Sequence, residues 1–302
     1  MSRIHDALLR AEQERARATG APAPSPAAVL PEAAEAVLQN DIAMPAVPPM
    51  EPQPAPVMSE RLTWETLQSR CARREWNFAV GRGISVLDEE SVGLEELRTL
   101  RTRLYQLRGN APLKTVLVAS SLPGEGKTFL SCTLSQVIAR QRGRRVLLID
   151  GDLRLPRLHT EFGAPASPGL SEYLKGDADE FAILQRGPVE GLMLVPGGAQ
   201  VQNPAELLAG SGLRRFLDRV GHCFDWIFID SPAAVPIADA SVLANLCDGV
   251  LMVVRAGKTP YDLAQKTRQE FAQARMLGVV INGIKRNSSY SSYYYRSYGA
   301  KR

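Results

Sequence analysis

Six short runs of apolar, largely β-branched residues recur from about residue 80 onward, and helix-like stretches separate them. The runs span Thr115–Ala119, Val146–Ile149, Leu192–Val195, Trp226–Ile229, Val250–Val254 and Gly278–Ile281. Continuous apolar strands joined by helices are typical of a parallel sheet that helices cover on both faces. The pattern therefore predicts an α/β fold with a mostly parallel sheet, in which ligands bind at the carboxyl ends of the strands.

The chain before residue 80 has a different pattern. Residues 1–17 carry apolar residues at helical spacing and predict a short amphipathic helix, with a frayed terminus as the alternative. Residues 18–79 are rich in Ala and Pro and predict a disordered linker, because such a segment buries too little apolar surface to offset its ordering entropy. The rest divides into a folded domain over 80–287 and a Tyr-rich tail over 288–302.

A glycine-rich segment follows the first predicted strand and precedes a helical stretch. It matches a P-loop at every position over 121–128 but the first, where Ser121 replaces Gly. Gly124 and Gly126 permit backbone angles that turn amide N–H groups toward phosphate oxygens. A chance glycine-rich turn is the alternative, and the flanking strand and helix argue against it. The segment predicts a P-loop NTPase fold that binds ATP through Pro123, Gly124, Glu125, Gly126, Lys127, Thr128 and Phe129.

Three aspartates stand directly after predicted strands. Asp150 and Asp152 follow the second apolar run, and Asp230 follows the fourth. Carboxylates beside a buried strand are costly without a cation, and Mg²⁺ next to a P-loop would supply one. We therefore expect Mg²⁺ to bind Thr128, Asp152 and Asp230, with a helix N-cap as the alternative role of Asp152.

Several further motifs occur together in this chain. They are Asp150-Gly151-Asp152-Leu153-Arg154, Glu95-Glu96-Leu97-Arg98-Thr99-Leu100-Arg101, Asn203-Pro204-Ala205-Glu206-Leu207-Leu208, Asp230-Ser231-Pro232 and a tyrosine-rich end. With them the chain resembles, over roughly residues 90–302, the bacterial tyrosine autokinases (BY-kinases) of polysaccharide synthesis and export. Its front end resembles soluble members that pair with a separate membrane protein.

The resemblance implies roles for four catalytic residues. Lys127 holds phosphates, Asp150 and Asp152 act around the metal, and Asp230 holds the metal through a water. Asp150 is the preferred acceptor of the tyrosine proton. This assignment agrees with the chemistry, because phosphoryl transfer needs mainly positioning and charge neutralisation. Ser121 departs from the family pattern and puts the geometry of the loop in question.

Five of the eight tyrosines fall within the last thirteen residues of the chain. One interpretation is that this cluster is a terminus that associates nonspecifically, or an aromatic patch that binds a partner. Beside a kinase-like site, we instead expect the cluster to accept phosphate. A short tail that begins soon after the last strand reaches a neighbour's site more readily than its own. The expected phosphoacceptors are Tyr290, Tyr293, Tyr294, Tyr295 and Tyr298.

A helix predicted over 95–108 carries a leucine stripe toward the core and a separate charged stripe. A solvated face with weak i,i+3 pairs is one interpretation of the charges. The resemblance instead implies that Glu95, Arg98 and Arg101 form a subunit contact, which closes a head-to-tail homo-oligomer into a ring. It also implies a separate transmembrane chain-length or co-polymerase protein as activator, and a tyrosine phosphatase.

The composition of the chain bears on which partners it binds and where in the cell it is found. The chain has 302 residues and a formal net charge of +4, and its basic residues form no stripe, so we expect no nucleic acid partner. Its four cysteines have no metal-ligand spacing. No apolar run approaches the ~20 residues that span a bilayer. We therefore expect a cytoplasmic protein that reaches the inner membrane through a partner.

Two other functions fit the same fold. A partitioning-type ATPase switch would carry a signature lysine early in the P-loop, where this chain has Leu122, and has no use for a tyrosine cluster. A non-catalytic nucleotide-sensing docking module would have no need of the retained lysine and aspartates. By analogy with related P-loop folds, Asn282 is a further candidate to touch the adenine.

Overall fold

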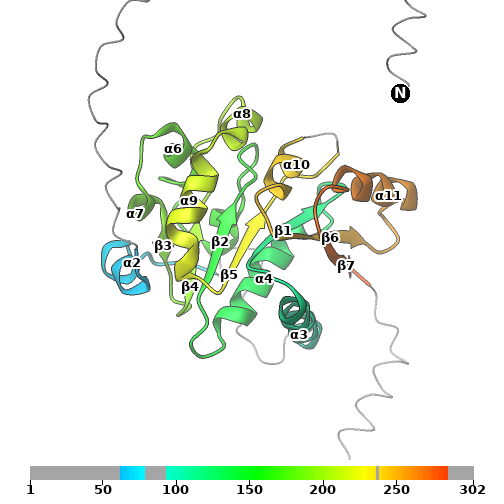
Figure 1. The fold of residues 1–302 in the computed structure, drawn as a ribbon, viewed down its shortest axis with the longest axis horizontal. Helices are drawn as coiled ribbons and strands as arrows, with labels where there is room; N and C mark the ends of the chain where they lie inside the picture. Colours follow the sequence, from blue (N-terminus) through cyan, green and yellow to red (C-terminus); the bar gives the residue numbers. More distant parts are fainter. Residues whose placement is uncertain (1–61, 79–92, 236–237, 285–302) are drawn as a thin grey trace, which may run out of the picture. The chain divides into compact units, whose positions relative to one another are not determined.

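The computed structural model describes residues 62–78, 93–235 and 238–284, which contain a seven-stranded sheet with strand order β3-β4-β2-β5-β1-β6-β7 (Figure 1). All neighbouring strands are parallel except β3 and β4. The strands are β1 Thr115–Ser120, β2 Val146–Asp150, β3 Gln185–Arg186, β4 Leu192–Val195, β5 Trp226–Asp230, β6 Gly249–Arg255 and β7 Met276–Asn282. All six predicted strands are therefore confirmed.

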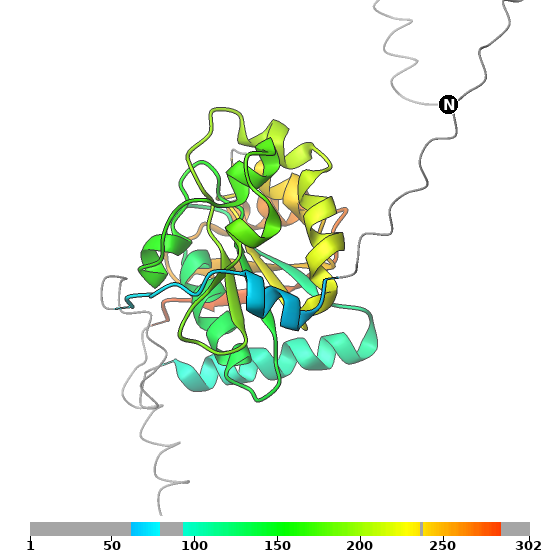
Figure 2. The same cartoon turned by 90° about the vertical axis from the view of Figure 1, so that its left-hand side faces the viewer.

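Helices cover both faces of this sheet, as the apolar pattern predicts. Strand residues alternate between two cores. Leu117 belongs to the core that contains residues of α2, α6, α8, α9 and α10, whereas Val116 belongs to the core that contains residues of α3, α4 and α5. Figure 2 shows α3 and α9 on opposite sides of the sheet. The helices are α2 Trp64–Arg70, α3 Leu94–Asn110, α4 Lys127–Ala139, α5 Leu158–Phe162, α6 Leu170–Lys175, α7 Glu180–Ile183, α8 Pro204–Ala209, α9 Gly212–Val220, α10 Asp239–Ala244 and α11 Tyr261–Glu270.

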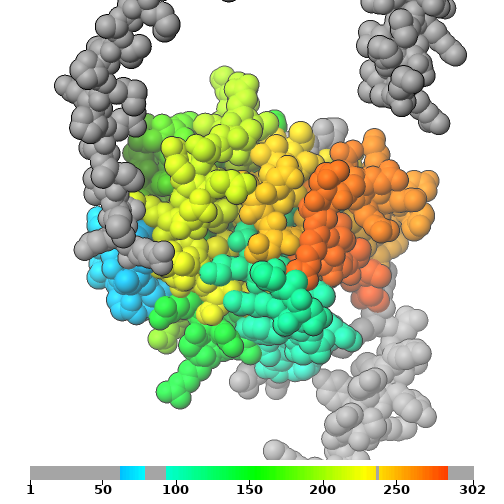
Figure 3. Space-filling model, in the orientation of Figure 1, coloured from blue at the N-terminus to red at the C-terminus, as the bar shows by residue number. Residues whose placement is uncertain are grey.

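The end of the segment predicted as a disordered linker, 18–79, is folded. Thr63 caps α2 by accepting a 3.2 Å hydrogen bond from the N–H of Thr66. Trp64 and Leu67 are buried in the core, and Trp64 meets Phe224 edge to face at 5.6 Å between ring centroids. Figure 3 shows this segment in blue beside the yellow-green α9 region. The prediction was wrong here because a helix of seven residues with one buried face gives little signal beside an Ala/Pro-rich stretch. Residues 1–61, including the predicted helix 1–17, lie outside the described residues.

The helix predicted over 95–108 is present as α3. Leu104 is buried, and Leu97, Leu100 and Leu107 pack against the same core, which confirms the leucine stripe. No helix among the described residues is long and apolar enough to cross a membrane.

Candidate active site

The P-loop connects β1 to α4 in the form that its glycines predict. Gly124 and Gly126 have φ angles of +80° and +100°, a region that residues with a side chain rarely adopt. Gly126 is the N-cap of α4, so the positive end of that helix faces the loop. A Cβ built on Gly126 would lie 2.0 Å from Nδ2 of Asn282. The second glycine therefore provides both the backbone angle and the space that this loop needs.

Lys127 and Thr128 begin α4 and lie beside the end of β5. The hydroxyl of Thr128 donates to Oδ2 of Asp230 at 2.7 Å. The hydroxyl of Ser131, one turn further along α4, donates to Oδ1 of the same carboxylate at 3.1 Å. Ser131 has no place in the P-loop motif, and only its position four residues after Lys127 could have indicated this contact. These hydroxyls join the phosphate loop to the expected metal-binding aspartate.

The surroundings of Asp230 fit a Mg²⁺ ion. The residue is 1% exposed, and burial raises the pKa of its carboxyl, although Lys127, Thr128 and Ser131 act to lower it. A cation would compensate this buried charge. Among the described residues, no group of three or more Asp, Glu, His or Cys side chains is arranged to hold an ion. Mg²⁺ is usually held by one or two carboxylates together with substrate phosphates and water, and Asp230 and Thr128 offer oxygen ligands of this kind.

Asp150 ends β2 and faces Asp230 in the register of the sheet. It has no exposed surface, and burial raises the pKa of its carboxyl to about 8, with the charge of Asp230 adding to the effect. Its oxygens accept hydrogen bonds from the N–H groups of Asp152 at 3.2 Å, Arg157 at 2.9 Å and Leu158 at 2.9 Å. Asp150 therefore organises the loop that follows β2 while its carboxylate stays buried.

Asp152, two residues further on, is the more accessible of the pair. Its side chain is 13% exposed, and its Oδ2 lies 3.7 Å from Nζ of Lys127. Its Oδ1 accepts the N–H of Leu155 at 3.0 Å, so it also fixes the local turn. Gly151 separates the two aspartates because a Cβ there would lie 2.8 Å from the carbonyl oxygen of Asp230. The Asp-Gly-Asp spacing thus points one carboxylate inward and leaves the other beside the P-loop lysine.

Two of the residues expected to contact nucleotide differ in how far their side chains are exposed. Phe129 is 48% exposed on α4, whereas the side chain of Glu125 is turned into the protein and is 3% exposed. Asn282, the candidate adenine contact, donates instead to the carbonyl oxygen of Glu125 at 2.9 Å. The pair of Arg154 with Asp239, at 2.7 Å and 3.1 Å, is a further fixed contact beside this loop that the motifs did not predict.

The expected subunit-contact residues on α3 divide into two kinds. Arg98 pairs with Glu95 of its own helix, one turn away. Arg101 reaches α4 and donates to the carbonyl oxygen of Val137 at 3.2 Å.

The five tail tyrosines lie outside the described residues.

Known proteins resemble this chain in both sequence and fold. The family described as CobQ/CobB/MinD/ParA nucleotide binding domain matches residues 116–296. The tyrosine-protein kinase YwqD of Bacillus subtilis is 33% identical over 220 residues, which cover 72% of this chain and 91% of YwqD. The putative tyrosine-protein kinase EpsB of Ralstonia nicotianae is 34% identical over 223 residues, which are 71% of this chain but only 29% of EpsB.

Among solved structures, the kinase domain of the Escherichia coli tyrosine kinase ETK superposes with a TM-score of 0.62. It is 31% identical, and the match covers 64% of this chain and 77% of that domain. The family match over residues 116–296 spans the P-loop and the three strand-end aspartates.

Proposed function

The chain belongs to the bacterial tyrosine kinases of the CobQ/CobB/MinD/ParA nucleotide-binding family, and we propose that it phosphorylates the tyrosines of its own C-terminal tail in trans. The observation that carries this proposal is the placement of two separate carboxylates around Lys127 and Thr128. Asp230 is bonded to Thr128 at 2.7 Å, and Asp152 lies 3.7 Å from Lys127. One acidic group is thus available for a metal and another for the acceptor.

The P-loop residues position the phosphates. The backbone N–H groups of the loop surround the phosphate oxygens, and Lys127 neutralises charge on the β and γ phosphates. Mg²⁺, held by Thr128 and Asp230, would supply further charge neutralisation on those oxygens. Positioning and charge neutralisation account for most of the catalysis of phosphoryl transfer, because the protein forms no covalent bond to the phosphoryl group.

Asp152 is the residue that we propose to receive the proton of the incoming tyrosine hydroxyl. A general base must reach the proton that it accepts, and Asp152 retains exposed surface, whereas Asp150 has none. The sequence favours Asp150 for this role, and Asp150 stays the alternative base that variants of the two residues distinguish. Asp150 keeps an essential role by holding the loop on which Asp152 stands.

The acceptors are proposed to be Tyr290, Tyr293, Tyr294, Tyr295 and Tyr298 of a neighbouring copy in a ring. β7 ends at Asn282, so few residues separate the sheet from the tyrosine cluster. An extended chain advances only ~3.3–3.6 Å per residue, which favours a neighbour's site. In the ring, Glu95, Arg98 and Arg101 would contact the next copy.

We place the protein in the cytoplasm, beside the inner membrane. The family resemblance supports a role in regulating exopolysaccharide synthesis or export, with a transmembrane co-polymerase as activator and a tyrosine phosphatase that resets the tail. An ATPase switch and a nucleotide-sensing docking module are the competing functions on this fold.

The test is to incubate the full chain with Mg²⁺ and ATP and to map phosphate by mass spectrometry. Lys127→Met and a deletion after Asn287 are the test variants, and Lys175→Met, on α6, is the matched control. Phosphate on Tyr290–Tyr298 in wild type and control, but not in Lys127→Met, is expected. ATP hydrolysis without phosphotyrosine would favour the ATPase switch, and neither activity, even with the activator's cytoplasmic segment added, would favour the docking module.

A further inference from the structure

Glu125 is an acidic residue in a loop that must bind phosphates. A carboxylate facing phosphate oxygens would repel them, and the structure turns this one away from them. Its Oε2 accepts the N–H of Leu122 at 2.8 Å, at the start of the same loop. Its Oε1 accepts the hydroxyl of Thr259, which lies in the turn between β6 and α11. Glu125 therefore closes the loop on itself and ties it to a distant segment.

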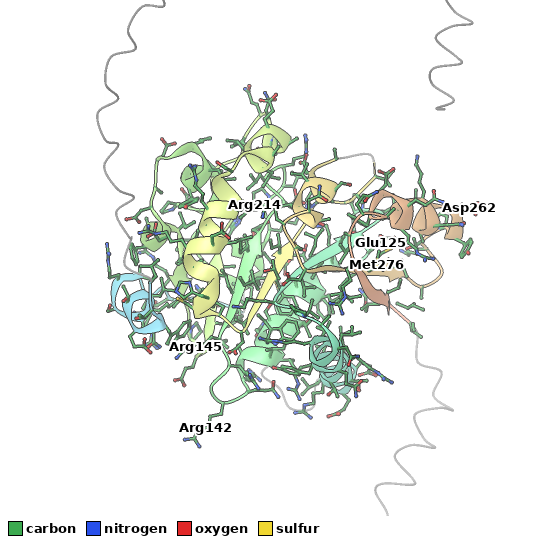
Figure 4. All side chains as sticks on the ribbon, viewed as in Figure 1. Glu125, Arg142, Arg145, Arg214, Asp262 and Met276 are labelled. Carbon is green, nitrogen blue, oxygen red and sulfur yellow. The ribbon has the colours of Figure 1, made fainter. Side chains whose placement is uncertain are left out.

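Residues of β6, β7 and α11 hold the P-loop at three more points. Nη1 of Arg255 donates to the carbonyl oxygen of Gly124 at 2.8 Å. Asn282, at the end of β7, donates to the carbonyl oxygen of Glu125 at 2.9 Å. The fully buried Thr267 of α11 donates to the hydroxyl of Ser121 at 2.9 Å. Figure 4 shows Glu125 beside the α11 and β7 elements.

One of these bonds involves the residue at which this P-loop departs from the usual motif. Ser121 stands where the first glycine is expected, and its hydroxyl accepts the bond from Thr267. Thr259 links Arg255 to Glu125, because its hydroxyl accepts the N–H of Arg255 at 2.8 Å while it donates to Glu125. A phosphate-binding loop without ligand has amides that point inward with no partner, so outside contacts are needed to keep it open.

We propose that Thr259, Arg255 and Asn282 are positioning residues that hold the P-loop in its phosphate-binding form before nucleotide arrives, with Glu125 as the brace through which Thr259 acts. This inference rests on the proposed nucleotide site and deepens it. None of the four side chains needs to touch a phosphate. Their effect is on nucleotide affinity, because a loop already held open loses less conformational entropy when it binds.

The experiment measures binding of ADP to the full chain by calorimetric titration with Mg²⁺ present. Thr259→Val keeps the shape of the side chain and removes its hydroxyl, whereas Thr259→Ser keeps the hydroxyl. We expect Thr259→Val to weaken ADP binding by roughly five- to tenfold, which is the size of one ordinary hydrogen bond. Thr259→Ser is expected to bind within about twofold of wild type. Thr66→Val, on α2 and away from the P-loop, is the matched control.

Kinase assays separate positioning from chemistry. KM for ATP is expected to rise with the loss of ADP affinity in Thr259→Val, while kcat at saturating ATP stays as in wild type. Arg255 is exposed, so Arg255→Ala is expected to leave the protein folded. This variant is a second test, and it is expected to bind ADP roughly twofold to fivefold more weakly than wild type.

Unchanged ADP affinity in both Thr259→Val and Arg255→Ala would overturn the inference, and so would a fall in kcat without a rise in KM. The ADP measurement does not depend on phosphotyrosine. If the variants lose ADP affinity while wild type forms no phosphotyrosine, the brace stands and the proposed kinase function fails.

Discussion

The hydroxyl of Thr128 donates a 2.7 Å hydrogen bond to Oδ2 of Asp230, and this bond joins the first turn of α4 to the end of β5. The two residues are 102 positions apart in the chain, so the contact exists only because β5 pairs with β1 in parallel. The P-loop and the strand-end acid are thereby brought to one point, where a metal bound to ATP phosphates would lie.

Asp230→Asn is expected to remove the increase in ATP affinity that Mg²⁺ gives, while the P-loop remains able to bind nucleotide. The amide keeps the shape and one acceptor for Thr128, but it lacks the charge that a cation needs. ATP affinity in Mg²⁺ is expected to fall by about tenfold or more, which is about 1.4 kcal/mol or more, with little change in EDTA. Titration of both proteins in the two buffers checks this. An equal loss in both buffers would contradict the assignment of Asp230 to the metal.

Asp152→Asn is expected to lower kinase activity, whereas Asp150→Ala is expected to lower the stability of the fold. If Asp152 receives the tyrosine proton, Asp152→Asn lowers phosphotyrosine formation by roughly 10²–10⁴-fold and leaves the free energy of unfolding nearly unchanged. Asp150→Ala removes the acceptor of the Arg157 and Leu158 N–H groups, so it is expected to cost about 1–3 kcal/mol of stability. Urea unfolding beside a kinase assay separates them, and a stable but inactive Asp150→Ala would return the base to Asp150.

The sequence was informative where one local requirement determines the residue type. Continuous apolar runs indicated six strands, and glycines at positive φ indicated the P-loop. The two-residue strand β3 carries no periodic signal. The inward turn of Glu125 could not be predicted, because its partner Thr259 is 134 positions away. Helical periodicity placed Arg101 on the charged stripe, but a long side chain can still reach a carbonyl on the neighbouring helix.

Leu67→Ala tests whether α2 belongs to the folded domain. Leu67 has no exposed surface and belongs to the same core as the buried residues of α9, so its truncation is expected to cost about 2–5 kcal/mol. Ser69→Ala, on the exposed side of the same helix, is expected to change stability by less than about 0.5 kcal/mol. Urea unfolding of both variants checks the difference, and equal midpoints would mean that α2 adds nothing to the fold.

Arg98→Ala and Arg101→Ala are expected to differ in stability. Arg98 is paired only with Glu95 across one turn of an exposed helix face, a contact worth ~0.2–0.5 kcal/mol, so its loss is expected to affect the ring and not the fold. Arg101 donates a hydrogen bond to α4, so Arg101→Ala is expected to affect both the ring and the fold.

Phosphorylated tails, at about −1.5 to −2 charges per tyrosine, are expected to loosen the ring of the wild type. Light scattering after size exclusion measures each mass, and an unchanged mass on phosphorylation would refute the loosening.

Glu172 gives a pH dependence that is independent of the active site. Burial raises the pKa of its carboxyl, but the N–H groups of Ala199 at 3.0 Å and Gly169 at 2.8 Å outweigh this and hold the pKa at about 2. The ordinary value of 4.5 applies to the unfolded chain. A depressed pKa in the folded state contributes stability above pH 4.5, and that stability is lost as the pH falls from 4.5 toward 2.

Glu172→Gln is therefore expected to cost about 1–2 kcal/mol at pH 7, since solvent screening reduces the value that the pKa shift alone would suggest. The cost is expected to shrink as the pH falls through the same window, because the wild-type carboxylate becomes protonated there. Glu206→Gln, on the exposed surface of α8, is the matched control, and its stability curve is expected to parallel that of the wild type. Urea unfolding at several pH values between 7 and 3 measures the difference, and a cost that stays constant with pH would show that the side chain acts through packing and not through its charge.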